Sequence, residues 1–108
     1  MQTDYQIILT TCPDQLQAET LANSLIEAGL AACVNIIPGL TSIYKWKGEL
    51  TSGTEVQLVI KTHSKRYPEV ENHIAALHPY ELPEIISVPI TNGLPDYLTW
   101  IDSATGIS

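Results

Sequence analysis

Basic side chains are scarce in this sequence of 108 residues. Five Lys and Arg stand against twelve Asp and Glu, so the formal net charge is −7 at pH 7. All five basic residues fall between positions 45 and 66. A protein that binds nucleic acid or an anionic membrane needs a basic patch that neutralises phosphates. The composition therefore argues against both partners and makes cations the natural small partners.

Long apolar runs and cysteines are also few. No apolar run approaches the roughly 20 residues that a helix needs to cross a bilayer, so we expect no membrane insertion. The two cysteines, Cys12 and Cys33, do not form a spaced disulfide framework, and no secretory signal precedes them. We therefore expect two free thiols and a cytoplasmic location.

Motifs of common catalytic sites are missing as well. The sequence has no phosphate-binding glycine loop, no closely spaced Cys/His quartet, and only one Arg for a phosphoryl clamp. Nothing marks a nucleophile, so we do not expect an enzyme. The length predicts a single domain over residues 1–108, which is small for a deep private cleft and makes oligomerisation worth considering.

Residues 31–49 and 55–62 predict one long β-hairpin. β-Branched and aromatic residues dominate both arms. Lys47-Gly48 can form a two-residue turn between them, because Gly adopts positive φ without steric cost. We expect the rest of the chain to pack on this hairpin or to extend its edges.

The register of this hairpin raises a problem in the sequence. If the ladder runs unbroken from its turn, Leu40 lies opposite Glu55, which places an apolar residue against a charged one. A bulge at Ser52-Gly53 would shift Leu40 to face Val56, and Gly within a strand often marks a bulge. The sequence therefore predicts a bulge at Ser52-Gly53.

Apolar patterning and capping residues predict the other elements. The first helix carries Leu16 on its apolar face, and the second carries Leu77. In chain order the sequence predicts a buried strand over 5–11, a helix that Asp14 caps and Gly29 ends, a helix that Ser64 caps and His78-Pro79 ends, a strand over 85–91, and a short helix over 94–101.

Two prolines select the topology of this α+β chain. Pro38 and Pro89 lie in the second and fourth predicted strands, and Pro belongs on edge strands because it cannot donate to a ladder. A ferredoxin-like βαββαβ fold, with an antiparallel sheet in the order 4-1-3-2, places these two strands at the edges. Two exposed edges on a small sheet favour oligomerisation through those edges.

Five segments carry a resemblance to a known family. They are residues 30–39 (LAACVNIIPG), 42–48 (SIYKWKG), 55–62 (EVQLVIKT), 78–84 (HPYELPE) and 97–101 (YLTWI). In this order, and over almost the whole chain, they resemble the CutA family of divalent-cation-tolerance proteins. The resemblance implies a ferredoxin-like protomer, a homotrimer joined through strand edges as in PII signalling proteins, and a link to divalent metals and copper binding.

The resemblance also implies metal ligands. In the family a cysteine on the first strand and a histidine pair before Pro-Tyr are the proposed copper ligands. Here Thr10 and Leu77 stand at two of these positions, so only His78 carries over. Cys12 lies two residues from Thr10 and shares its face of the strand, and a thiolate with an imidazole suits copper. Cys12 and His78 are therefore the metal candidates, for copper or another divalent cation.

Both candidates have a simpler structural interpretation. His78 ends a helix and can satisfy local carbonyl groups, while Cys12 can be a small buried apolar residue. Cys33 belongs to the edge-strand segment and is expected to be structural. We expect His63 and His73 to be solvated.

Aromatic and charged residues in the hairpin and the proline-rich loop exceed what a core needs. They suit a subunit interface, which we favour, or a ligand cleft between subunits. The set comprises Tyr44, Trp46, Lys61, Tyr80, Glu81 and Glu84. The leading hypothesis is a cytoplasmic homotrimer that acts in divalent-metal tolerance and binds metal weakly. The alternative is a PII-like signalling or scaffold trimer whose intersubunit cleft binds a small molecule or a protein.

Overall fold

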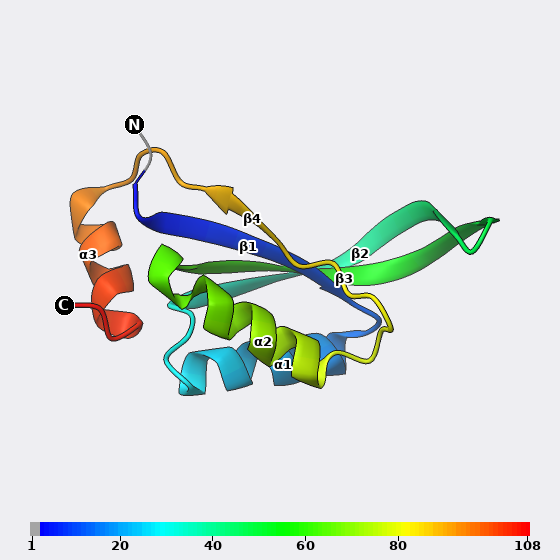
Figure 1. Ribbon diagram of the computed structural model, residues 1–108, viewed down its shortest axis with the longest axis horizontal. Helices are drawn as coiled ribbons and strands as arrows, with labels where there is room; N and C mark the ends of the chain where they lie inside the picture. The colour runs from blue at the N-terminus through cyan, green and yellow to red at the C-terminus, as the bar shows by residue number, and fades with distance from the viewer. Residues whose placement is uncertain (1–2) are drawn as a thin grey trace.

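Four antiparallel strands and three α-helices form the part of the chain that the computed structural model describes, residues 3–108 (Figure 1). The sheet has the order β2-β3-β1-β4, which confirms the predicted ferredoxin-like topology. In chain order the elements are β1 (Tyr5–Cys12), α1 (Gln15–Glu27), β2 (Cys33–Trp46), β3 (Glu49–His63), a 3₁₀ turn (Ser64–Arg66), α2 (Tyr67–Leu77), β4 (Ile86–Pro89) and α3 (Pro95–Ala104). Within residues 3–108 no helix is long and apolar enough to cross a membrane.

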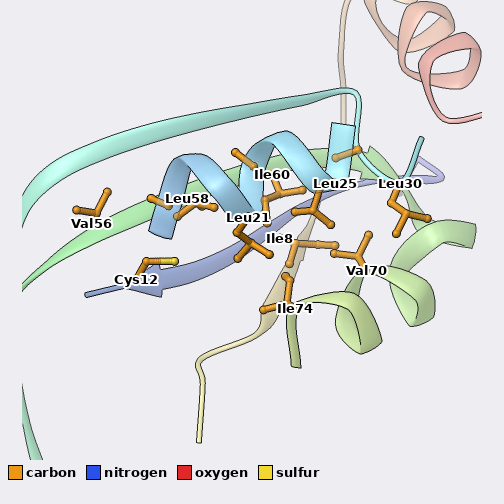
Figure 2. Close-up of a cluster of buried hydrophobic side chains, with 13 residues drawn as sticks. Ile8, Cys12, Leu21, Leu25, Leu30, Val56, Leu58, Ile60, Val70 and Ile74 are labelled. Carbon is orange, nitrogen blue, oxygen red and sulfur yellow. The ribbon is translucent and has the colours of Figure 1, made fainter. Parts of the chain in front are cut away.

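The hydrophobic core lies between one face of the sheet and the helices α1 and α2 (Figure 2). Alternate residues of a strand point to the same face, so Ile8 and Cys12 of β1 are buried together with Leu58 and Ile60 of β3. The helices contribute the buried residues Ala18, Leu21, Ala22, Leu25, Val70 and Ile74.

Leu16 and Leu77 are exposed, so their prediction as core residues of the two helices was wrong. The first turn of α1 and the last turn of α2 border an open pocket of about 230 Å³, which both leucines line. The residues of α1 that face the sheet therefore begin after Leu16, and those of α2 end before Leu77.

The hairpin turn forms at the predicted residues. Lys47 has φ of 51° and Gly48 has φ of 84°, and two consecutive positive φ values are those of a type I′ turn. The arms β2 and β3 are much longer than the other strands, and their outer half projects beyond the body of the molecule (Figure 1).

The predicted bulge at Ser52-Gly53 was wrong. Leu40 pairs with Glu55, and the register shift lies between Ile37 and Leu40. The intervening Pro38 has no N-H to donate, and Gly39 has φ of 77°, which favours glycine. An apolar residue can face a charged one here because the projecting part of the hairpin has no helix packed on it.

Two histidines lie differently from the prediction of solvated rings. His63 is only 5% exposed, because it ends β3 directly opposite Tyr5, whose ring it meets edge-on at 5.3 Å. Its Nδ1 accepts from the backbone N-H of Lys65 and so begins the 3₁₀ turn that precedes α2. His73 is partly buried, with Nε2 2.8 Å from Oγ of Ser24. Ser64 therefore starts the 3₁₀ turn rather than capping α2.

The predicted ends of the other elements hold within a few residues. Gly29, with φ of 70°, follows the end of α1, and His78 leaves the helical region before Pro79. β4 is shorter than the predicted strand over 85–91, and α3 begins and ends later than the predicted helix over 94–101.

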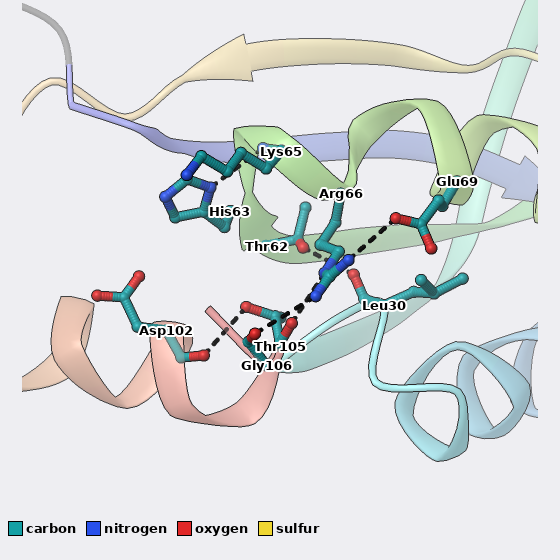
Figure 3. Close-up of polar contacts among 9 residues, drawn as sticks. All are labelled: Leu30, Thr62, His63, Lys65, Arg66, Glu69, Asp102, Thr105 and Gly106. Carbon is teal, nitrogen blue, oxygen red and sulfur yellow. Dashed lines mark hydrogen bonds and ion pairs between the residues drawn. The ribbon is translucent and has the colours of Figure 1, made fainter. Parts of the chain in front are cut away.

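Hydrogen bonds and an ion pair join segments of the chain at the end of the sheet that lies away from the hairpin turn (Figure 3). The fully buried Thr62 donates through Oγ1 to the carbonyl oxygen of Leu30 at 2.7 Å. Arg66 donates through Nε to the carbonyl oxygen of Thr105 at 2.8 Å, and its Nη1 lies 3.0 Å from Oε1 of Glu69. These bonds join the end of α3 to the start of α2 and the loop after α1 to β3.

Replacing Thr62 by Val should lower the free energy of unfolding by about 1–3 kcal/mol, because the buried carbonyl of Leu30 loses its donor while side-chain volume is kept. Urea denaturation at one fixed protein concentration measures the change. Thr41→Val, at an exposed position of β2, is the matched control and should have little effect. Equal stability of the two variants would contradict the assignment.

Candidate functional site

A groove of about 690 Å³ lies between the outer half of the hairpin and the loop that joins α2 to β4. In Figure 1 this loop passes the region where β2 and β3 leave the sheet. Five of the six predicted cleft or interface residues meet here, since the groove is lined by Tyr44, Trp46, Tyr80, Glu81 and Glu84, together with Thr11, Ser42, Ile43, Glu55, Pro79 and Leu82.

Glu55 is the central carboxylate of this groove. The hydroxyl of Tyr80 donates to its Oε2 at 2.7 Å. Partial burial of Glu55 raises its pKa, but the hydroxyls of Ser42, Tyr80 and Thr11, with a smaller contribution from His78, outweigh this effect and lower the pKa overall. Burial and the bond to Glu55 raise the pKa of Tyr80. At neutral pH the pair is therefore a carboxylate and a neutral phenol.

His78 holds the loop against the end of β1. Its Nε2 lies 2.6 Å from the carbonyl oxygen of Thr11, and its Nδ1 accepts from the backbone N-H of Tyr80 at 3.1 Å. A carbonyl only accepts, so Nε2 carries the proton. Both ring nitrogens are then engaged, and neither has a free lone pair for a metal.

Cys12, the second metal candidate, lies close to His78. The two residues line the open pocket of about 230 Å³ between the ends of α1 and α2. Burial raises the pKa of the Cys12 thiol to about 11, with Asp14 and Glu55 adding to the effect. The thiol is thus protonated at neutral pH, whereas a metal binds the thiolate.

The remaining donors do not complete a metal site in the protomer. Over residues 3–108 no three or more His, Cys, Asp and Glu side chains gather so as to hold a metal ion. Cys33, at the start of β2, is half-buried and free like Cys12, which agrees with the expectation of two free thiols. The donor set present does not fit a tightly bound resident copper ion.

Lys61 lies apart from the groove. It is part of the inner half of β3, where it pairs with Ile7 and Cys33. Its Nζ lies 5.9 Å from the ring centre of Tyr97 in α3, and that ring lies 5.4 Å from the ring of Trp100. The structure thus places the sixth predicted residue with an aromatic pair at the opposite end of the sheet.

Glu55 is a member of the site that the sequence patterns did not mark as one. The signal for it was the mismatch between Leu40 and Glu55, which also suggests a bulge. The mismatch instead marks a carboxylate that lies beside the aromatic residues of the hairpin.

Replacing Tyr80 by Phe should make the stability of the protein less dependent on acid. A carboxyl with a lowered folded pKa stabilises the fold above its unfolded pKa and loses this contribution as pH falls through the folded pKa. Without the Tyr80 hydroxyl the pKa of Glu55 rises, so the loss between about pH 5 and 3 becomes shallower. Urea denaturation across this range measures it, with Tyr97→Phe as the control; identical curves for wild type and Tyr80→Phe would contradict the role of this bond.

Comparison with known proteins gives the family. The family model described as "CutA1 divalent ion tolerance protein" matches residues 6–104. A divalent-cation tolerance protein CutA from Thermus thermophilus is 46% identical over 101 residues, which cover 94% of this chain and 98% of that protein. A CutA homologue from Xenopus laevis is 50% identical over 91 residues, which cover 84% of this chain and 60% of that protein.

Solved structures agree with this result. The crystal structure of CutA from Xylella fastidiosa is 43% identical, with a TM-score of 0.93 over 95% of this chain and 99% of that one. A Cut A1 divalent cation tolerance protein from Thermus thermophilus gives a TM-score of 0.92 at 45% identity over 94% of this chain and 99% of that one. With a model match over most of its length, and relatives this similar, the chain belongs to the CutA1 family of divalent ion tolerance proteins.

Proposed function

We propose that this chain works as a homotrimer in tolerance to divalent metal ions, copper among them, and that it binds metal only weakly. The observation that carries the assembly is the face of the sheet that α1 and α2 do not cover. The observation that carries weak binding is the engagement of both candidate ligands in the fold.

The open face of the sheet carries apolar residues on all four strands, although Asn35, Gln57 and Lys61 also point to it. Because strand residues alternate, the neighbours of the buried residues point to this face: Ile7, Leu9 and Val59 are half-buried. Closer to the edges, Ile37 is 47% exposed, Ile86 51% and Val88 45%. A contiguous apolar surface of this kind is unusual on a monomer and suits association with further copies of the chain.

The two edges of the sheet make a closed ring possible. β2 and β4 each present one unpaired edge, and they lie on opposite sides of the sheet. Different surfaces that join head to tail form a ring when the rotation closes. Three subunits are the number that the family resemblance implies, and the projecting hairpin of each can reach a neighbour.

The proposal for metal follows from the chemistry of Cys12 and His78. Copper or another divalent cation would have to displace a proton from a thiol whose pKa is raised and break one hydrogen bond of the imidazole. Both costs lower the affinity. We also propose a cytoplasmic location, which the two free cysteines support.

The PII-like alternative is also a trimer, but its function does not involve binding a metal ion. A signalling or scaffold trimer would bind a small molecule or a protein at a cleft between subunits. Ligand binding that does not depend on a metal ion, in a protein without stoichiometric metal binding, would favour this alternative.

Replacing Val88 by Lys should weaken the trimer, because it places a charge on the open face of the sheet. We expect a trimer for the wild type at micromolar concentration by light scattering, and at least about tenfold weaker association for Val88→Lys. Leu16→Lys, at an exposed leucine on the helical side, should leave the trimer intact. A wild-type monomer at this concentration would overturn the proposal.

Copper titration by calorimetry should give weak binding, and the double variant Cys12→Ser with His78→Ala should weaken it further. As a control, the double variant Cys33→Ser with His73→Ala also removes one thiol and one imidazole. It should bind copper as the wild type does. Tight stoichiometric binding that survives loss of Cys12 and His78 would mean that other residues hold the metal.

A further inference from the structure

We propose that the groove between the hairpin and the loop after α2 binds a small organic ammonium ion, with Glu55 as the counter-charge and Tyr44, Trp46 and Tyr80 as its walls. This site is formed within one protomer. It does not depend on metal binding or on the trimer.

The three aromatic side chains give the groove its ligand-facing surface. All three rings line the groove and are 36–48% exposed, so they are not buried in the hydrophobic core. Tyr44 and Trp46 come from β2, whereas Tyr80 comes from the loop after α2, so two segments of the chain supply the rings. The negative face of an aromatic ring attracts cations, and an organic ammonium ion gains more than Na⁺ does because removing its weaker hydration costs less.

Glu55 supplies a negative charge that nothing in the groove neutralises. Its Oε2 accepts from the hydroxyl of Tyr80 at 2.7 Å, and a neutral hydroxyl donor does not cancel the charge of the carboxylate. Among the described side chains that line the groove none is basic, while Glu81 and Glu84 add two further carboxylates. Nζ of Lys47 lies 3.7 Å from Oε2 of Glu81 and 5.9 Å from the ring centre of Trp46, so an organic cation would compete with Lys47 for this ring. The side chains of Lys47 and Glu81 are largely exposed, so water screens their ion pair.

The same geometry disfavours a metal ion as the occupant. Mg²⁺ and Ca²⁺ need several converging oxygen ligands. Over residues 3–108 no three acidic, histidine or cysteine side chains converge in this way, and one oxygen of Glu55 already accepts from Tyr80. A carboxylate beside aromatic rings, without a cluster of converging ligands, instead suits an organic monocation, and about 690 Å³ is room for a small molecule.

The test uses the full chain and two probes of similar shape, tetramethylammonium chloride and neutral tert-butanol, at constant ionic strength. Binding is followed by NMR through the indole N-H signals of Trp46 and Trp100. We expect tetramethylammonium to shift the Trp46 signal in a saturable way, with Trp100 unchanged because it lies in α3 outside the groove. The neutral probe should cause no saturable shift.

Two variants with equal charge separate the site from the overall acidity of the protein. Glu55→Gln keeps the shape and can still accept from Tyr80, and it should weaken tetramethylammonium binding by at least about tenfold. Glu27→Gln removes an exposed carboxylate at the end of α1 and should bind as the wild type does.

Several results would overturn the inference. Equal shifts from both probes would show an apolar groove without charge selectivity, and saturable binding of Mg²⁺ or Cu²⁺ that displaces tetramethylammonium would show a metal site. Absence of binding would also overturn it, and trimers of Glu55→Gln that dissociate more readily would then assign Glu55 to a contact between subunits. Light scattering on the same samples tests the trimer independently, so either proposal can fail alone.

Discussion

The packing of α1 and α2 on one face of a four-stranded sheet is the constraint on which the rest of the molecule depends. Every second residue of β1 from Ile8 onward and of β3 from Val56 onward is buried, and Ile8, Leu58 and Ile60 are fully inaccessible. Because side chains alternate, the intervening residues must point to the opposite face. The helices α1 and α2 thus cover one face, and the other face is open except where α3 meets Tyr5 and Lys61.

The hairpin extends the same sheet beyond its helices. Past the bulge at Pro38-Gly39 no helix packs on β2 and β3. The alternation of apolar and polar residues that marks a half-buried strand is therefore not required there. His78, Tyr80 and Glu55 then connect this free segment to the body: the loop is anchored to β1 at Thr11 and to β3 at Glu55. These hydrogen bonds therefore hold the loop that forms one side of the groove.

The sequence predicted the parts of the structure that local chemistry determines. The turn at Lys47-Gly48, the ends of the helices at Gly29 and His78, and the edge positions of the two proline-containing strands follow from φ preferences and missing donors. The bulge was misplaced because the sequence does not show where the helices stop covering the hairpin. His63 is buried at the end of β3, where it meets Tyr5, and this long-range contact is not visible in the local sequence. Lys61 was grouped with the groove residues, although its contact with Tyr97 depends on where α3 docks.

The groove and the open face are parts of one continuous surface. Glu55 and Val59 are four residues apart on β3, so both side chains point to the same side of the sheet. Subunits that cover the apolar part of this side would therefore come close to the rim of the groove. In such an arrangement the hairpin carries both functions, because its inner half supplies the apolar contact and its outer half supplies the site.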